Sequence, residues 1–127
     1  MQELINRVAA AAGIDEGLAT KAVGMILGFL QKEGPQAQVQ QMLAALPGAE
    51  ALIAQGEGEG GGGLMGMVGG LMGGGIMGLG ANLMGAGLDM GQISTVGKEL
   101  MAFGREQAGE DVMGQIVAGT PGLSQFV

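Results

Sequence analysis

The chain has 127 residues, five of them basic and twelve acidic, and a net charge of −7. Nucleic-acid binding needs a basic face that neutralises phosphates, so this balance argues against DNA and RNA as partners. Cysteine and histidine are both absent, which removes disulfides, thiolate chemistry and the commonest general base and metal ligand. Apolar residues make up 47% of the chain and aromatic residues only 2%. Because Ala, Leu and Met favour helices whereas strands favour β-branched and aromatic residues, the composition predicts an all-α fold.

The first elements in the chain have the apolar spacing of amphipathic helices. Residues 2–12 place Leu4, Ile5 and Val8 on one face. A helix is predicted over about 16–33, with Asp15 as its N-cap. Gly34 and Pro35 end it, because glycine suits a left-handed C′ position and proline suits the first turn of the next helix. The apolar positions of this second helix are Leu18, Ala22, Met25, Ile26, Phe29 and Leu30.

A third helix is predicted over about 35–46, before a break at Pro47-Gly48 and a short helical turn that carries Leu52 and Ile53. Shifted by 74 residues, the chain then matches itself without a gap: residues 13–53 align with residues 87–127. Such self-similarity indicates a duplicated structural unit. The aligned identities include Gly13/Gly87, Asp15/Asp89, Gly17/Gly91, Phe29/Phe103, Gln41/Gln115, Pro47/Pro121 and Gly48/Gly122.

The second copy predicts the same order of helices. Asp89 caps a helix over about 90–107, and Gly109 separates it from a helix over about 110–119. Acidic residues at the helix starts are explained by capping and by the helix dipole, not by acid–base chemistry. The inward positions are expected to be Ile93, Val96, Leu100 and Phe103, then Val112, Met113, Ile116 and Val117.

Between the copies lies a glycine-rich centre. Residues 60–88 carry no charge, and residues 56–80 contain 14 glycines in 25 positions. One interpretation is a flexible linker. The other is a glycine-zipper helix, because a glycine recurs every fourth residue and forms a ridge on which another helix can pack closely. The proposed contact residues are Gly62, Gly66, Gly70, Gly74 and Gly78 on the ridge and Leu64, Val68, Leu71 and Leu79 on the apolar stripe.

We adopt the zipper interpretation, with a turn or linker over 54–63 and a helix over about 64–86. The domain organisation is then a first helical repeat at 1–53, a linker and zipper at 54–75, and a second repeat at 76–127. The uncharged length would suffice for a membrane span of about 20 residues. However, half of it is glycine, aromatic belts are absent, and its flanks are acidic, which favours a buried or intersubunit helix.

The methionines of the glycine-rich centre are candidate metal ligands. Met65, Met67, Met72, Met77 and Met84 are thioether groups that could suit Cu(I). Without histidine or cysteine beside them, packing in a core at helical spacing is the favoured interpretation. A Met-rich surface that accepts an apolar ligand or peptide is the alternative. No metal and no cofactor is therefore expected.

Residues 3–50 and 99–127 carry further local motifs, among them ELINRVA, LPGAE and the terminal PGLSQFV. In these stretches the chain resembles small uncharacterised bacterial proteins of a domain-of-unknown-function family. The resemblance implies a helical fold and a bacterial origin, and it supplies no activity and no catalytic residues.

These observations predict a non-enzymatic structural or interaction protein that forms a homo-oligomer through the zipper. The alternative is a peripheral membrane or hydrophobic-ligand protein that uses residues 64–86. The N-terminal sequence lacks the basic region and long apolar run of a secretory signal. A cytoplasmic location is therefore expected, with membrane association as the alternative.

Overall fold

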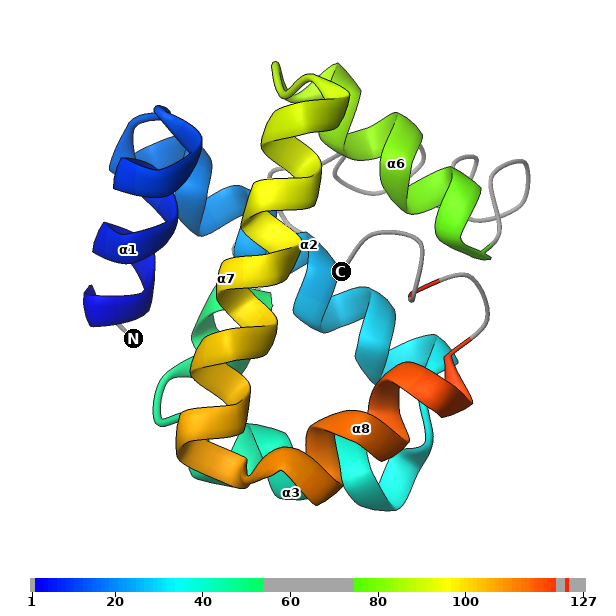
Figure 1. Cartoon of the computed structure of the whole chain (residues 1–127). Coiled ribbons are helices and arrows are strands. Elements are labelled where there is room, and N and C mark those ends of the chain that lie inside the picture. Colours follow the sequence, from blue (N-terminus) through cyan, green and yellow to red (C-terminus); the bar gives the residue numbers. More distant parts are fainter. Residues whose placement is uncertain (1, 54–74, 121–122, 124–127) are drawn as a thin grey trace.

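The structure is a computed structural model, and it describes residues 2–53, 75–120 and 123. Within these residues every regular element is a helix and no strand occurs, which confirms the predicted all-α class (Figure 1). The helices are α1 (Gln2–Ala12), α2 (Glu16–Glu33), α3 (Gln36–Ala45), α6 (Gly75–Gly85), α7 (Met90–Ala108) and α8 (Glu110–Gly119). A further helical turn covers residues 49–53.

Side-chain caps fix the starts of the two longest helices where the sequence predicts them. The Asp15 carboxylate accepts a hydrogen bond of 2.6 Å from the Leu18 amide. The Asp89 carboxylate accepts one of 2.8 Å from the Gln92 amide, and the Gln92 side chain accepts one of 3.0 Å from the Asp89 amide. These bonds satisfy amides that lack partners inside the helix. Both N-cap predictions are confirmed.

The end of α2 differs from its prediction. Gly34 has φ −84° and ψ 173°, an extended conformation rather than a left-handed one. Glycine is needed at this position because a side chain would not fit. A Cβ there would lie 2.7 Å from the Leu30 carbonyl oxygen and 3.0 Å from the Thr120 hydroxyl. Pro35 is the N-cap of α3, so that helix begins one residue later than predicted. The predicted left-handed conformation of Gly34 was wrong. A residue before proline favours extended backbone, and the glycine here allows close packing.

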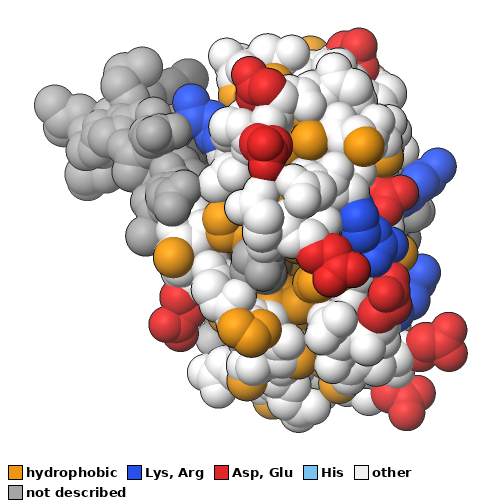
Figure 2. All heavy atoms as spheres, turned by 90° about the vertical axis from the view of Figure 1, so that its left-hand side faces the viewer, with side chains coloured by type: hydrophobic (Ala, Val, Ile, Leu, Met, Phe, Trp, Pro, Cys, Tyr) orange, Lys and Arg blue, Asp and Glu red, His pale blue; other side chains and the backbone are white. Residues whose placement is uncertain are grey.

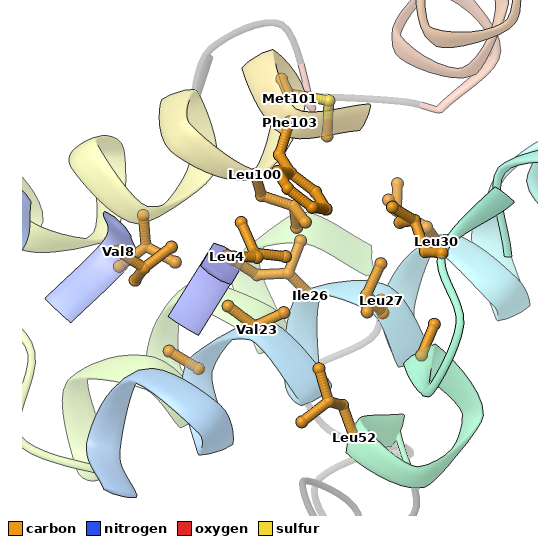
Figure 3. Packing of buried hydrophobic residues seen from close by; sticks show 14 of the residues in the cluster. Leu4, Val8, Val23, Ile26, Leu27, Leu30, Leu52, Leu100, Met101 and Phe103 are labelled. Atoms are coloured by element: carbon orange, nitrogen blue, oxygen red, sulfur yellow. The ribbon is translucent and has the colours of Figure 1, made fainter. Parts of the chain in front are cut away.

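One hydrophobic core joins all the described helices. Figure 3 shows side chains of α1, α2 and α7 meeting in it, among them Leu4, Ile26 and Leu100. α2 contacts α1, α3, α6 and α7, so it is covered on several sides. For that reason Ala19, Val23 and Leu27 are buried in addition to the predicted Ala22, Ile26 and Leu30, whereas Leu18, Met25 and Phe29 are only partly buried.

The order of helices in residues 2–45 recurs in residues 75–119. α2 and α7 start 74 residues apart, and so do α3 and α8. Gly13 and Gly87 both have a positive φ, and the residue after each donates back into the preceding helix: Ile14 to Ala9 at 3.0 Å and Leu88 to Leu83 at 3.2 Å. A six-residue loop closed in this way is the Schellman motif that ends many helices. Local structure therefore follows the aligned sequence, while a duplication with internal symmetry stays a prediction.

Candidate functional site

α6 is the described part of the predicted contact helix. It carries no charged residue and packs against α2 and α7. Gly78 is buried there, and Leu79 is only 7% exposed. The chain's own core thus surrounds these two predicted contact residues. The other predicted contact residues lie outside the described part of the chain: Gly62, Leu64, Gly66, Val68, Gly70, Leu71 and Gly74.

Beneath α6 lies a small apolar cavity of about 10 Å³. Ile26 of α2, Leu79 and Leu83 of α6, and Met101 of α7 contribute to its wall. This space is about the size of one water molecule, and apolar side chains form almost all of its wall. It is therefore a gap in side-chain packing, much smaller than the several hundred cubic ångströms of a ligand site.

The corner where α6 meets α7 exposes two large apolar side chains. Met84 is 52% exposed and Met90 is 60% exposed. The core-packing prediction for Met84 was wrong, because Leu79 and Leu83 form the inward face of α6 and Met84 lies about 100° around the helix from Leu83. Of the other central methionines, Met77 lies in α6 without a described side chain, and Met65, Met67 and Met72 lie outside the described residues.

A charged cluster joins α1 to α7. Acidic and basic side chains also lie beside one another on the face of the molecule drawn in Figure 2. The Arg7 guanidinium donates a hydrogen bond of 2.8 Å to the Glu106 carboxylate and lies 3.6 Å from Glu99. It also sits 5.7 Å from the centre of the Phe103 ring. The hydrogen bond to Glu106 raises the pKa of Arg7 above its ordinary value, against the opposing effect of desolvation.

This cluster was not anticipated from the sequence. Glu99, Phe103 and Glu106 are spaced by four and three residues, and that spacing places them on one face of α7. This spacing is visible in the sequence, but no local pattern identifies Arg7, which lies between 92 and 99 residues earlier in the chain, as the partner of these side chains. The cluster holds α1 and α7 together.

Among residues 2–53, 75–120 and 123, no group of three or more acidic side chains is arranged to hold a metal ion. No helix in these ranges combines the length and the hydropathy that crossing a bilayer requires. Thr120 is the buried polar side chain of the described core, and its hydroxyl donates to the Ile116 carbonyl at 2.7 Å.

Comparison with protein-family models, with curated proteins and with solved structures gave no match. The resemblance to a domain-of-unknown-function family accordingly stays a prediction.

Proposed function

We propose that this chain is a non-enzymatic structural or interaction protein that self-associates through its glycine-rich centre, in the cytoplasm. The observation that carries the proposal is the recurrence of glycine at every fourth position from Gly58 to Gly78 within a stretch without charge. A helix so poor in side chains is costly, at about 1 kcal/mol per glycine relative to alanine. Close packing against another helix compensates for that cost.

Two features of the described residues agree with this proposal. The chain is helical from Gly75, inside the predicted zipper range of 64–86. The surface of α6 also lacks the charges that would keep another apolar helix away. Because Gly78 and Leu79 are used in the chain's own core, the contact with a second copy falls to the earlier members of the ridge, Gly62 to Gly74.

The test is the replacement Gly70→Leu, which places a large side chain on the ridge. We expect the oligomer to dissociate, seen as a fall in molar mass by light scattering, while far-UV circular dichroism shows the flanking helices still folded. Gly69→Leu is the matched control, because the same side chain then lies about 100° away from the ridge. Equal mass for both variants and the parent protein would contradict the zipper.

A second candidate is a peripheral membrane or hydrophobic-ligand protein, and the exposure of Met84 and Met90 favours it. Flexible, polarisable methionines adapt to varied apolar partners. Flotation with vesicles of neutral phosphatidylcholine tests this function, because the net charge of −7 disfavours anionic lipid. Binding that is lost in Met84→Gln/Met90→Gln would support it. Recovery of the parent protein wholly in the unbound fraction would reject it.

A further inference from the structure

The corner where α6 ends and α7 begins is open to solvent around its two methionines. Met84 lies in the last turn of α6 and Met90 is the first residue of α7, and their exposed fractions are 52% and 60%. The backbone beside them is open as well, because a Cβ built on Gly85 or Gly87 would meet nothing within 4 Å. In Figure 1 this corner lies at the opposite end of the molecule from α3 and α8. A small reagent or an enzyme therefore has access to both side chains.

Three other methionines of the described residues are enclosed in the core. Met42, Met101 and Met113 are each at most 1% exposed. Met101 lies among the apolar core side chains that Figure 3 shows and lines the small cavity beneath α6. The Met113 sulfur is packed so closely on α7 that a Cβ built on Gly104 would lie 2.7 Å from it. An oxygen atom added to these sulfurs would be crowded and removed from water, which is costly for a polar group.

The chain's only sulfur groups are thioethers, because cysteine is absent. A hydroperoxide transfers one oxygen atom to a thioether: the sulfur loses two electrons, the O–O bond breaks, and water or an alcohol leaves. The product, methionine sulfoxide, is polar. Methionine sulfoxide reductases reverse the step; two electrons from a dithiol restore the thioether, the oxygen leaves as water, and the dithiol becomes a disulfide.

We propose that Met84 and Met90 form a reversible oxidation site, oxidised by a hydroperoxide and restored by methionine sulfoxide reductases. The fold tolerates the added oxygen because neither side chain holds the corner in place. Leu83 and Leu88 do so instead: they are 0% and 3% exposed, and the Leu88 amide donates a hydrogen bond of 3.2 Å to the Leu83 carbonyl. Oxidation turns an apolar corner into a polar one without unfolding it. The proposal requires neither self-association nor lipid binding.

The first test measures the oxidation rate of every methionine in the full chain. The protein is treated with dilute hydrogen peroxide, folded or in urea, and sampled over time for peptide mass mapping. We expect Met84 and Met90 to react in the folded protein within about threefold of their rates in urea, since susceptibility follows exposure. Met101 and Met113 should be slowed on the order of tenfold or more by folding, because they are only 1% exposed.

The oxidised, folded protein is then incubated with dithiothreitol and both reductases, one for each sulfoxide epimer. We expect mass mapping to show the thioether restored at Met84 and Met90. Folding that slows oxidation of Met84 and Met90 as much as that of Met101 would overturn the proposal. Sulfoxides at these two positions that the reductases leave unreduced in the folded protein would overturn it too.

A second test uses Met84→Leu/Met90→Leu, which keeps the apolar bulk of the corner but forms no sulfoxide there. Parent and variant share every other methionine, so oxidation elsewhere cancels when both are oxidised for the same time. The parent should lose more retention on a phenyl resin than the variant, and Met84→Gln/Met90→Gln should show the low retention of the oxidised parent before any oxidation. The fall in Tm on oxidation should differ between parent and leucine variant by under about 3 °C, as for a surface change. Equal losses of retention, or a much larger fall in Tm for the parent, would refute the site.

Discussion

Removal of the Arg7 side chain tests how strongly the charged cluster holds α1 on α7. The side chain is 32% exposed and that of Glu106 is 56% exposed. A pair in such a setting contributes about 0.2–1 kcal/mol, because water screens it. Its position 5.7 Å from the centre of the Phe103 ring adds about 0.5–1 kcal/mol, the range for partly exposed cation–π contacts.

Arg7→Ala should therefore lower the free energy of unfolding by about 1–2 kcal/mol. For a chain of this length that corresponds to a fall in Tm of roughly 4–8 °C. Urea unfolding followed by far-UV circular dichroism measures the change, since the chain has no tryptophan or tyrosine. Lys98→Ala removes a basic side chain from the exposed side of α7 and is the control, expected to change stability by under about 0.5 kcal/mol.

A double-mutant cycle of Arg7→Ala with Glu106→Gln isolates the pair itself. The coupling should be about 0.5 kcal/mol and should shrink in 1 M salt, where charges are screened within about 3 Å. The pKa of Arg7 is raised, so the guanidinium is charged at neutral pH. The coupling energy should therefore not change with pH in that range. A coupling of zero, or equal costs for Arg7→Ala and Lys98→Ala, would refute the assigned role.

Further predictions concern backbone and oxidation. Gly114→Ala should stabilise the protein by about 0.5–1 kcal/mol, because the added Cβ in α8 meets nothing within 4 Å and alanine favours helix. Gly109→Ala should destabilise it by about 1–3 kcal/mol, because φ is +101° there; thermal unfolding of both checks the opposite signs, and a shared sign would contradict the backbone assignment. Dilute hydrogen peroxide should oxidise Met84 and Met90 before Met101, which is 1% exposed. Peptide mass mapping measures the order, and equal rates in the folded protein would contradict the burial.

Helix boundaries could be predicted because the signals for them are local. Asp15 and Asp89 mark the starts of α2 and α7 through bonds to residues three positions later. Apolar spacing likewise identified inward positions such as Ile93 and Val96. Each of these features depends on neighbours within a turn or two of the same helix, so the amino-acid order alone contains it.

Contacts between distant segments could not be predicted in the same way. The extra burial of Val23 and Leu27 arises because several helices cover α2, and periodicity measures only one face. Met84 is exposed because other helices cover only one side of α6, and Met84 lies on the other side. The pairing of Arg7 with Glu106 requires knowledge that α1 docks on α7, which no local pattern supplies.

The packing of α6 divides the glycine ridge into two parts with different expected behaviour. Gly78 is buried among the chain's own helices, so Gly78→Leu overpacks the core and should cost about 1–3 kcal/mol of stability. Gly70→Leu, in contrast, should change molar mass at little cost in unfolding free energy if the earlier part of the ridge meets a second copy. Light scattering and urea unfolding of the two variants separate these effects. If both variants lost stability equally and kept the parent's mass, the whole ridge would belong to the chain's own fold and the zipper proposal would fail.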